Sequence, residues 1–114
     1  MSRTDALLKQ IDDCNNGIAL AEGIEKLYSN AQFKKVILKG YFEEEAVRLV
    51  ALLADSNMQS ELNQKYIHNA MLGIGELQTW LRAMIQRSDQ LKKMKLDCEQ
   101  ELEHLSNNPE ADND

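Results

Sequence analysis

The sequence predicts an all-α fold: an elongated antiparallel helical hairpin or bundle in which one long C-terminal heptad helix, at about residues 60–105, is covered by three shorter helices. The chain is rich in Leu, Lys, Glu, Gln and Ala, which are all strong helix formers. Its single proline, Pro109, lies near the end, so almost nothing interrupts a helix over most of the chain. Apolar residues also recur at alternating spacings of three and four, which is typical of helices with an apolar seam.

A length of 114 residues predicts one small domain over residues 1–106, followed by a polar, acidic tail at 107–114 that is expected to be disordered. The 13 basic and 19 acidic side chains leave a formal net charge of −6. The longest apolar run, 47–54, contains Arg48 and is much shorter than the roughly 20 residues of a membrane span. The first five residues lack the layout of a secretion signal. We therefore expect a soluble intracellular protein with no membrane partner.

The first helix is predicted over residues 5–28. Its apolar positions follow each other at spacings of 4, 3, 4 and 3, which forms a narrow heptad seam. These positions are Leu7, Ile11, Cys14, Ile18 and Ala21. Ser29 and Asn30 then predict a break.

Two further helices are predicted in the middle of the chain. A short one covers 31–39 and is expected to end at Gly40, because glycine readily adopts the left-handed conformation that closes a helix. The next begins near Glu43 and ends at Ala54, and it is apolar on nearly all sides, which indicates burial on more than one face. The candidate core residues of these two helices are Phe33, Ile37, Leu49, Val50 and Leu53.

A long helix is predicted after the turn signal at 55–57, because no strong stop signal follows before Pro109. Twelve positions within 60–105 alternate at spacings of three and four, and ten of them are apolar, the exceptions being Ser88 and Lys95. A helix of about 45 residues is roughly 67 Å long. A compact ball of 114 residues is only about 34 Å across, so we expect an elongated or bent molecule.

The seams also predict how the chain folds back on itself. A chain doubled at residue 56 brings Cys14 level with Cys98, and Ile11 level with Leu102. We therefore expect the first helix to pack antiparallel on the distal half of the long helix, while the middle helices cover its proximal half. Mild oxidation would then crosslink the two cysteines within one chain.

The sequence contains no motif for catalysis, nucleotide binding or metal binding. The two cysteines belong to no C-x-x-C pair and have no histidine at helical spacing, so we interpret them as reduced thiols in the core. Basic residues in 34–39 and 82–95 are mixed with acidic ones in a negatively charged chain, which disfavours nucleic acid as a partner. We predict no enzyme activity, no cofactor and no metal.

Trp80 lies beside the seam residue Leu81, where the apolar face widens from two positions per heptad to three or four. Such widening indicates a helix that packs against more than one partner. Two interpretations of Trp80 remain open: a core residue covered by the helix that contains 47–53, or an exposed interface anchor. The candidate interface residues are Ile74, Leu77, Trp80, Leu81, Met84, Leu91 and Leu102.

The segment FKKVILKGYFEEEAVRLV at 33–50, the segment LLAD at 52–55, and the later IGEL, WLR and Ile85 within 74–85 resemble a group of small proteins from tailed bacteriophages. The resemblance covers about residues 25–105. Such proteins are encoded near phage head and portal genes and are not enzymes, so the resemblance implies a role in the virion or its assembly. Ser56 departs from the proline expected at that position of the group, and no functional residue is carried over individually.

Together these patterns predict a non-enzymatic structural or assembly protein of a tailed phage virion that acts through helix–helix packing. Its expected partners are copies of itself and another virion protein, and its expected location is the bacterial host cytoplasm or the virion. The alternative is a phage-encoded intracellular adaptor or inhibitor that binds a host protein. Detection in purified particles would favour the first hypothesis, and a host protein in pull-downs the second.

Overall fold

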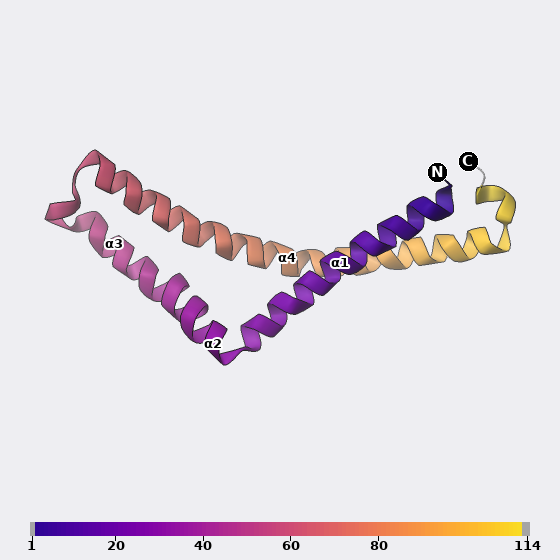
Figure 1. Ribbon diagram of the computed structural model, residues 1–114, viewed down its shortest axis with the longest axis horizontal. Coiled ribbons are helices and arrows are strands. Elements are labelled where there is room, and N and C mark those ends of the chain that lie inside the picture. The colour runs from indigo at the N-terminus through magenta and orange to yellow at the C-terminus, as the bar shows by residue number, and fades with distance from the viewer. Residues whose placement is uncertain (1, 113–114) are drawn as a thin grey trace. The chain divides into compact units, whose positions relative to one another are not determined.

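The computed structural model describes residues 2–112, which are helical apart from short turns and contain no strand (Figure 1). The all-α prediction is therefore confirmed. Clustering of contacts separates two compact units, which we call the terminal unit (Met1–Ile24 with Met84–Asp114) and the central unit (Glu25–Ala83). Each unit combines part of the long C-terminal helix with an earlier segment of the chain.

Helix α1 (Arg3–Ser29) confirms the first predicted helix and extends it slightly at both ends. The Ser2 hydroxyl accepts a hydrogen bond from the backbone N–H of Asp5 at 3.1 Å, and so satisfies a free donor of the first turn. The predicted break follows at Asn30, whose side-chain oxygen accepts from the N–H of Phe33 at 2.9 Å and caps the next helix.

The predicted break at Gly40 is wrong. Helix α2 (Ala31–Phe33), the π-helical segment η1 (Lys34–Glu45) and α3 (Ala46–Ala54) follow each other without interruption. No glycine of the described chain has a positive φ, so Gly40 does not close a helix. A Cβ atom there would lie 3.3 Å from the carbonyl oxygen of Lys35, five residues earlier, which is a tight contact. Glycine therefore fits the wide π turn, in which backbone groups five residues apart pair.

The core of the central unit is a cluster of Leu49, Ile67 and Ile74, all less than 5% exposed. Residues from η1, α3, α4 and the turn between α3 and α4 pack around it: Tyr41, Phe42, Ala46, Leu52, Leu53, Met58, Ala70 and Met71.

Of the candidate core residues, Leu49 is confirmed and Leu53 packs on the cluster, while Phe33 and Ile37 are half-buried. The assignment of Val50 to the core is wrong, because its side chain is 54% exposed. Consecutive residues of an α-helix are rotated by about 100°, so Val50 lies on a different face of α3 from the buried Leu49.

A compact turn separates α3 from α4. The Asp55 carboxylate accepts from the N–H of Asn57 at 2.8 Å and opens a short 3₁₀ helix, η2 (Ser56–Met58). The side chains of Gln59 and Gln64 donate to backbone carbonyl oxygens of this turn, and the hydroxyl of Ser60 caps the next helix by accepting from Asn63 at 3.1 Å. The turn predicted at 55–57 is confirmed.

Helix α4 (Glu61–Asn107) is continuous over 47 residues and confirms the long C-terminal helix. At 1.5 Å per residue it is about 70 Å long. A short 3₁₀ helix, η3 (Pro109–Asp112), follows it within the predicted acidic tail. Residues 113–114 of that tail lie outside the described part of the chain.

In the terminal unit, α1 packs antiparallel on the end of α4, as the seams predict. Leu7 clusters with Cys98 and Leu105, and the half-buried Ile11 and Leu102 pack against this cluster. Nearer the middle of α1, Gly17 faces Leu91 so closely that a Cβ atom at residue 17 would overlap the tip of that leucine side chain. A larger residue at this position would therefore have to displace the end of the Leu91 side chain.

Both cysteines are buried in this unit, as predicted, and neither forms a disulfide. Burial is the main cause that raises the pKa of the Cys98 thiol, and the nearby Cys14 adds to it. A raised pKa favours the protonated thiol, which reacts slowly. The crosslinking of Cys14 to Cys98 by mild oxidation stays a prediction.

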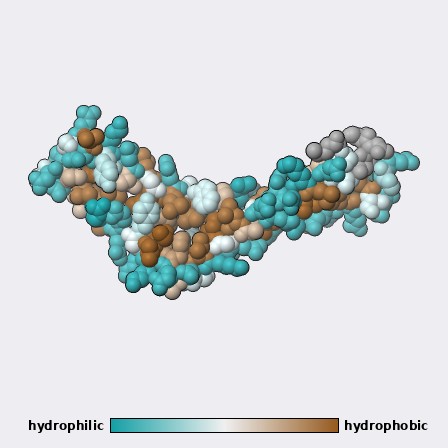
Figure 2. Space-filling model, in the orientation of Figure 1, coloured by the Kyte–Doolittle hydropathy of each residue, from teal (hydrophilic) through white to brown (hydrophobic). Residues whose placement is uncertain are grey.

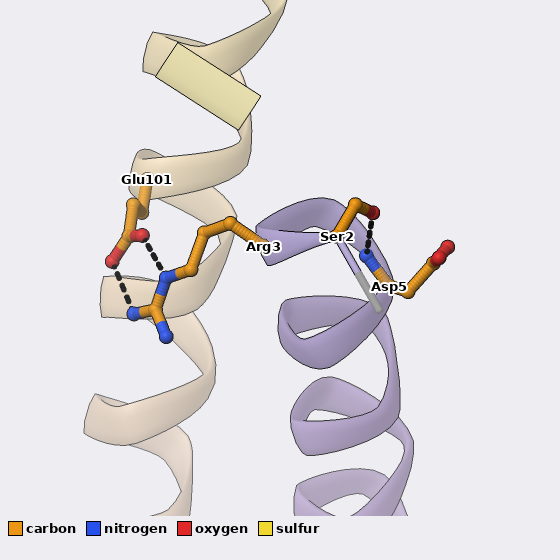
Figure 3. A network of polar contacts seen from close by, with 4 residues as sticks. All are labelled: Ser2, Arg3, Asp5 and Glu101. Carbon is orange, nitrogen blue, oxygen red and sulfur yellow. Dashed lines mark hydrogen bonds and ion pairs between the residues drawn. The ribbon is translucent and has the colours of Figure 1, made fainter. Parts of the chain in front are cut away.

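A polar contact ties the start of α1 to α4. The Arg3 guanidinium donates two hydrogen bonds to the Glu101 carboxylate, one of them at 2.9 Å, as Figure 3 shows. The hydrogen bonds from Arg3 lower the pKa of the Glu101 carboxyl below its usual 4.5. The two residues are 98 positions apart in sequence, so this exposed ion pair links the start of α1 to the distal part of α4.

Candidate functional site

An open apolar groove of about 800 Å³ lies on α4 in the central unit. Its lining residues all belong to that helix and repeat at spacings of three and one: His68, Met71, Leu72, Gly75, Glu76, Thr79, Trp80 and Ala83. The size falls within the usual range of ligand sites. We call this surface the α4 groove.

Most of the α4 groove lies on the side of the helix away from the core, whereas Met71, at the edge of the groove, also packs on the core cluster. Leu72 precedes the buried Ile74 by two residues, and Thr79 precedes the buried Leu81 by two. Two residue steps turn an α-helix by about 200°, so each groove residue lies nearly opposite its buried neighbour. Within the central unit, α4 thus carries apolar side chains on two faces.

Large apolar side chains in the groove are open to solvent. Leu72 is 61% exposed and Trp80 is 46% exposed. Between them a Cβ atom added to Gly75 would meet nothing within 4 Å, so the helix backbone itself is accessible there. A helix that exposes its backbone beside a tryptophan and a leucine allows a partner to approach closely.

The polar groups of the groove lie among these apolar ones. The Nδ1–H of His68 donates to the carbonyl oxygen of Gln64 at 2.7 Å, since a carbonyl oxygen can only accept. Glu76 and Thr79 are exposed. This mixture of a few polar groups with a larger apolar area is typical of protein-binding surfaces.

Exposed apolar side chains are concentrated in the central unit. Of thirteen large apolar residues that the described chain leaves exposed, nine belong to this unit. On the face seen in Figure 2, apolar residues gather over α3 and the first half of α4. Single exposed apolar side chains are common, whereas a contiguous patch marks an interaction site.

The seven candidate interface residues differ in how far the structure buries them. Trp80 lines the groove, so the interpretation as a core residue under the 47–53 helix is wrong, and Leu77 is 36% exposed. Three others are buried within the chain, which assigns them to intrachain packing: Ile74, Leu81 and Leu91. Met84 and Leu102 are half-buried.

Of the eight groove residues, the sequence candidates include only Trp80, and the missed residues that are apolar or small are Met71, Leu72, Gly75 and Ala83. A second apolar series along the same helix could have revealed them. It begins at Met71 and follows spacings of four through Gly75 and Thr79 to Ala83, beside the seam that was traced. The positions of this second series alternate along the sequence with those of the core seam. The sequence alone therefore predicts one wide apolar face instead of two separate ones.

The described residues show no arrangement for metal chemistry, since no three His, Cys, Asp or Glu side chains converge. No helix in this part of the chain is long and apolar enough to cross a membrane. In the central unit, Arg48 donates two hydrogen bonds to Glu45, at 2.6 and 2.7 Å, which lower the pKa of that carboxyl. This exposed pair lies within one helical segment and is separate from the groove.

No protein-family model, curated protein or solved structure matches the chain.

Proposed function

We propose that the chain is a non-enzymatic structural or assembly protein of a tailed phage virion, which binds copies of itself and a neighbouring virion protein through helix–helix packing. The observation that carries this proposal is the α4 groove. It leaves Leu72 and Trp80 exposed on a rigid helix whose other face already packs in the core.

The expected strength of self-association follows from the exposed apolar area. Full burial of a large apolar side chain contributes about 1.5–3 kcal/mol. Leu72 and Trp80 are roughly half buried already, so about half of that gain is left for each. Association also costs translational and rotational entropy. A groove of this size therefore supports reversible, concentration-dependent association, which many repeated contacts in a particle would reinforce.

The phage setting rests on the resemblance of residues 25–105 to small proteins encoded near head and portal genes. The wide apolar surface of the central unit supports a packing role, because an assembly protein needs surface that remains uncovered in the single chain.

Two measurements test the proposal. Sedimentation velocity of the full chain across a wide concentration range should give a mass that rises above the 13.0 kDa of one copy. Mass spectrometry of purified particles should detect the chain as a component. A protein that is monomeric at every concentration and absent from particles would contradict the proposal. A host protein captured in pull-downs would then favour the adaptor or inhibitor alternative.

A further inference from the structure

The central unit has a second apolar surface, on the outer face of α3. Val47 is 70% exposed and Val50 is more than half exposed, while Ala51 and Ala54 are also open to solvent. Leu49 faces the core two residues after Val47, so the outer face lies nearly opposite the buried one. Its side chains are small, which gives a smooth helical ridge. We call this surface the α3 ridge.

Residues of opposite charge flank one end of the α3 ridge and one end of the α4 groove. Glu43 and Glu44 are exposed just before the N-terminal end of the ridge. Arg82 does not itself line the groove, but it is exposed next to Ala83, the last lining residue at the C-terminal end. Within the described part of the chain none of the three belongs to an ion pair, so their charges remain available to a partner.

We propose that the α4 groove of one copy receives the α3 ridge of a second copy, with the two helices antiparallel. This inference rests on the proposed self-association and specifies its geometry. Glu44 and Ala54 are ten residues apart on one surface, as are Leu72 and Arg82 on the other. Each interval spans about 15 Å of helix, so Glu44 meets Arg82 when Ala54 meets Leu72.

This register also matches the sizes of the side chains. With Glu44 opposite Arg82, Ala51 lies opposite Gly75 and Val47 lies opposite Thr79. Ala51 is one of the two alanines of the ridge and Gly75 is the smallest residue of the groove, and nothing lies within 4 Å of a Cβ atom added to Gly75. The two backbones can therefore approach most closely at the middle of the contact, with Trp80 beside the ridge.

Pairing of two α4 grooves is less favourable on electrostatic grounds. The midpoint of the groove lies between Gly75 and Glu76. An antiparallel pair of grooves centred there brings two Glu76 carboxylates together, and like charges repel. It also leaves Glu43 and Glu44 without a role. When the α3 ridge of a second copy occupies the groove instead, the acidic Glu43 and Glu44 lie near the basic Arg82.

The proposed contact joins two different surfaces, so every copy keeps a free ridge and a free groove after binding one neighbour. Such heterologous contacts propagate into a ring if the rotation closes and into an open filament if it does not. Both outcomes extend beyond a dimer as the concentration rises.

Charge exchange between the two surfaces tests the geometry in the full-length protein. R82E and the double variant E43R/E44R should each raise the dissociation constant about tenfold, because an attraction becomes a repulsion. A mixture of the two variants should associate again, since the acidic groove of one meets the basic ridge of the other. The triple variant R82E/E43R/E44R should self-associate within about threefold of the wild type. The differences should shrink in 1 M salt.

Matched controls change the same number of charges in the terminal unit. K93E corresponds to R82E, and E99R/E103R corresponds to E43R/E44R, at exposed positions of α4. Circular dichroism checks that every variant keeps its helical content. Sedimentation velocity measures the association of each variant and of the mixture.

Rescue in the mixture and in the triple variant, with unchanged controls, would support the ridge-in-groove contact. If the wild type associates and R82E weakens it while E43R/E44R does not, the α3 ridge is not the occupant and the inference is overturned. If both variants behave like their controls, the inference is also overturned, while the proposed self-association stands. A wild type that remains monomeric at every concentration overturns both.

Discussion

In the terminal unit α4 buries one narrow seam against α1, whereas in the central unit it carries apolar side chains on two faces. The terminal unit leaves four large apolar residues exposed, and the central unit leaves nine. A single seam is satisfied by one partner helix. The second face remains largely exposed, so the first face accounts for folding and the second is the one that we propose for association.

The largest expected effect distinguishes the two faces of α3. Leu49→Ala removes a fully buried side chain from the central core and should lower the free energy of unfolding by about 2–5 kcal/mol. Val50→Ala, one residue later on the exposed face, should change it by no more than about 0.5 kcal/mol. Urea denaturation followed by circular dichroism measures both. Equal losses would show that α3 does not have a buried and an exposed face.

A smaller effect tests close packing in the terminal unit with two glycines of one helix. Gly23→Ala meets nothing within 4 Å and should stabilise α1 by about 0.5–1 kcal/mol, because alanine is the better helix former. Gly17→Ala gains the same propensity but must displace the tip of Leu91, so its net stabilisation should be smaller or reversed. The comparison uses urea midpoints. Equal stabilisation by both substitutions would contradict the close approach of α1 and α4.

The smallest expected effect concerns the ion pair that joins the two ends of the chain. The hydrogen bonds from Arg3 lower the pKa of Glu101 in the folded protein, so its contribution is fully present above pH 4.5 and is lost as the pH falls through the lowered pKa. The stability difference between wild type and Glu101→Gln should therefore be constant near neutral pH and shrink below pH 4.5.

Urea denaturation between pH 3 and pH 7 measures this difference. Glu99→Gln is the matched control, because Glu99 is exposed on the same helix and belongs to no ion pair of the described residues. A Glu101→Gln profile that parallels the control at every pH would show that the pair contributes nothing to the fold.

Much of the fold could be predicted because it depends on local patterns. The spacing of apolar residues and the turn at 55–57 place α1 and α4 within a few residues of their observed bounds. The register of Cys14 with Cys98 follows from doubling the chain at that turn. Burial of both thiols and the cluster of Leu7 with Cys98 agree with it.

Other features depend on geometry that the sequence pattern does not carry. Gly40 is a good helix terminator by propensity, yet it lies inside η1, where the wide π turn uses it for space. The only polar residue in the apolar run around Val50 is Arg48, which lies two residues before Val50 and so nearly opposite it on the helix, where it does not mark the side that Val50 exposes. The α4 groove was missed because its apolar series interleaves with the core seam, so only the position of α3 shows which series remains uncovered.

The most direct test of the central claim compares the same substitution in the two units. Leu72→Asp in the α4 groove and Leu96→Asp in the terminal unit replace leucines of one helix that are 61% and 53% exposed. Sedimentation velocity should find Leu72→Asp monomeric at concentrations where wild type and Leu96→Asp associate alike, because only the first places a charge in the proposed interface. Equal association of both variants would contradict the account.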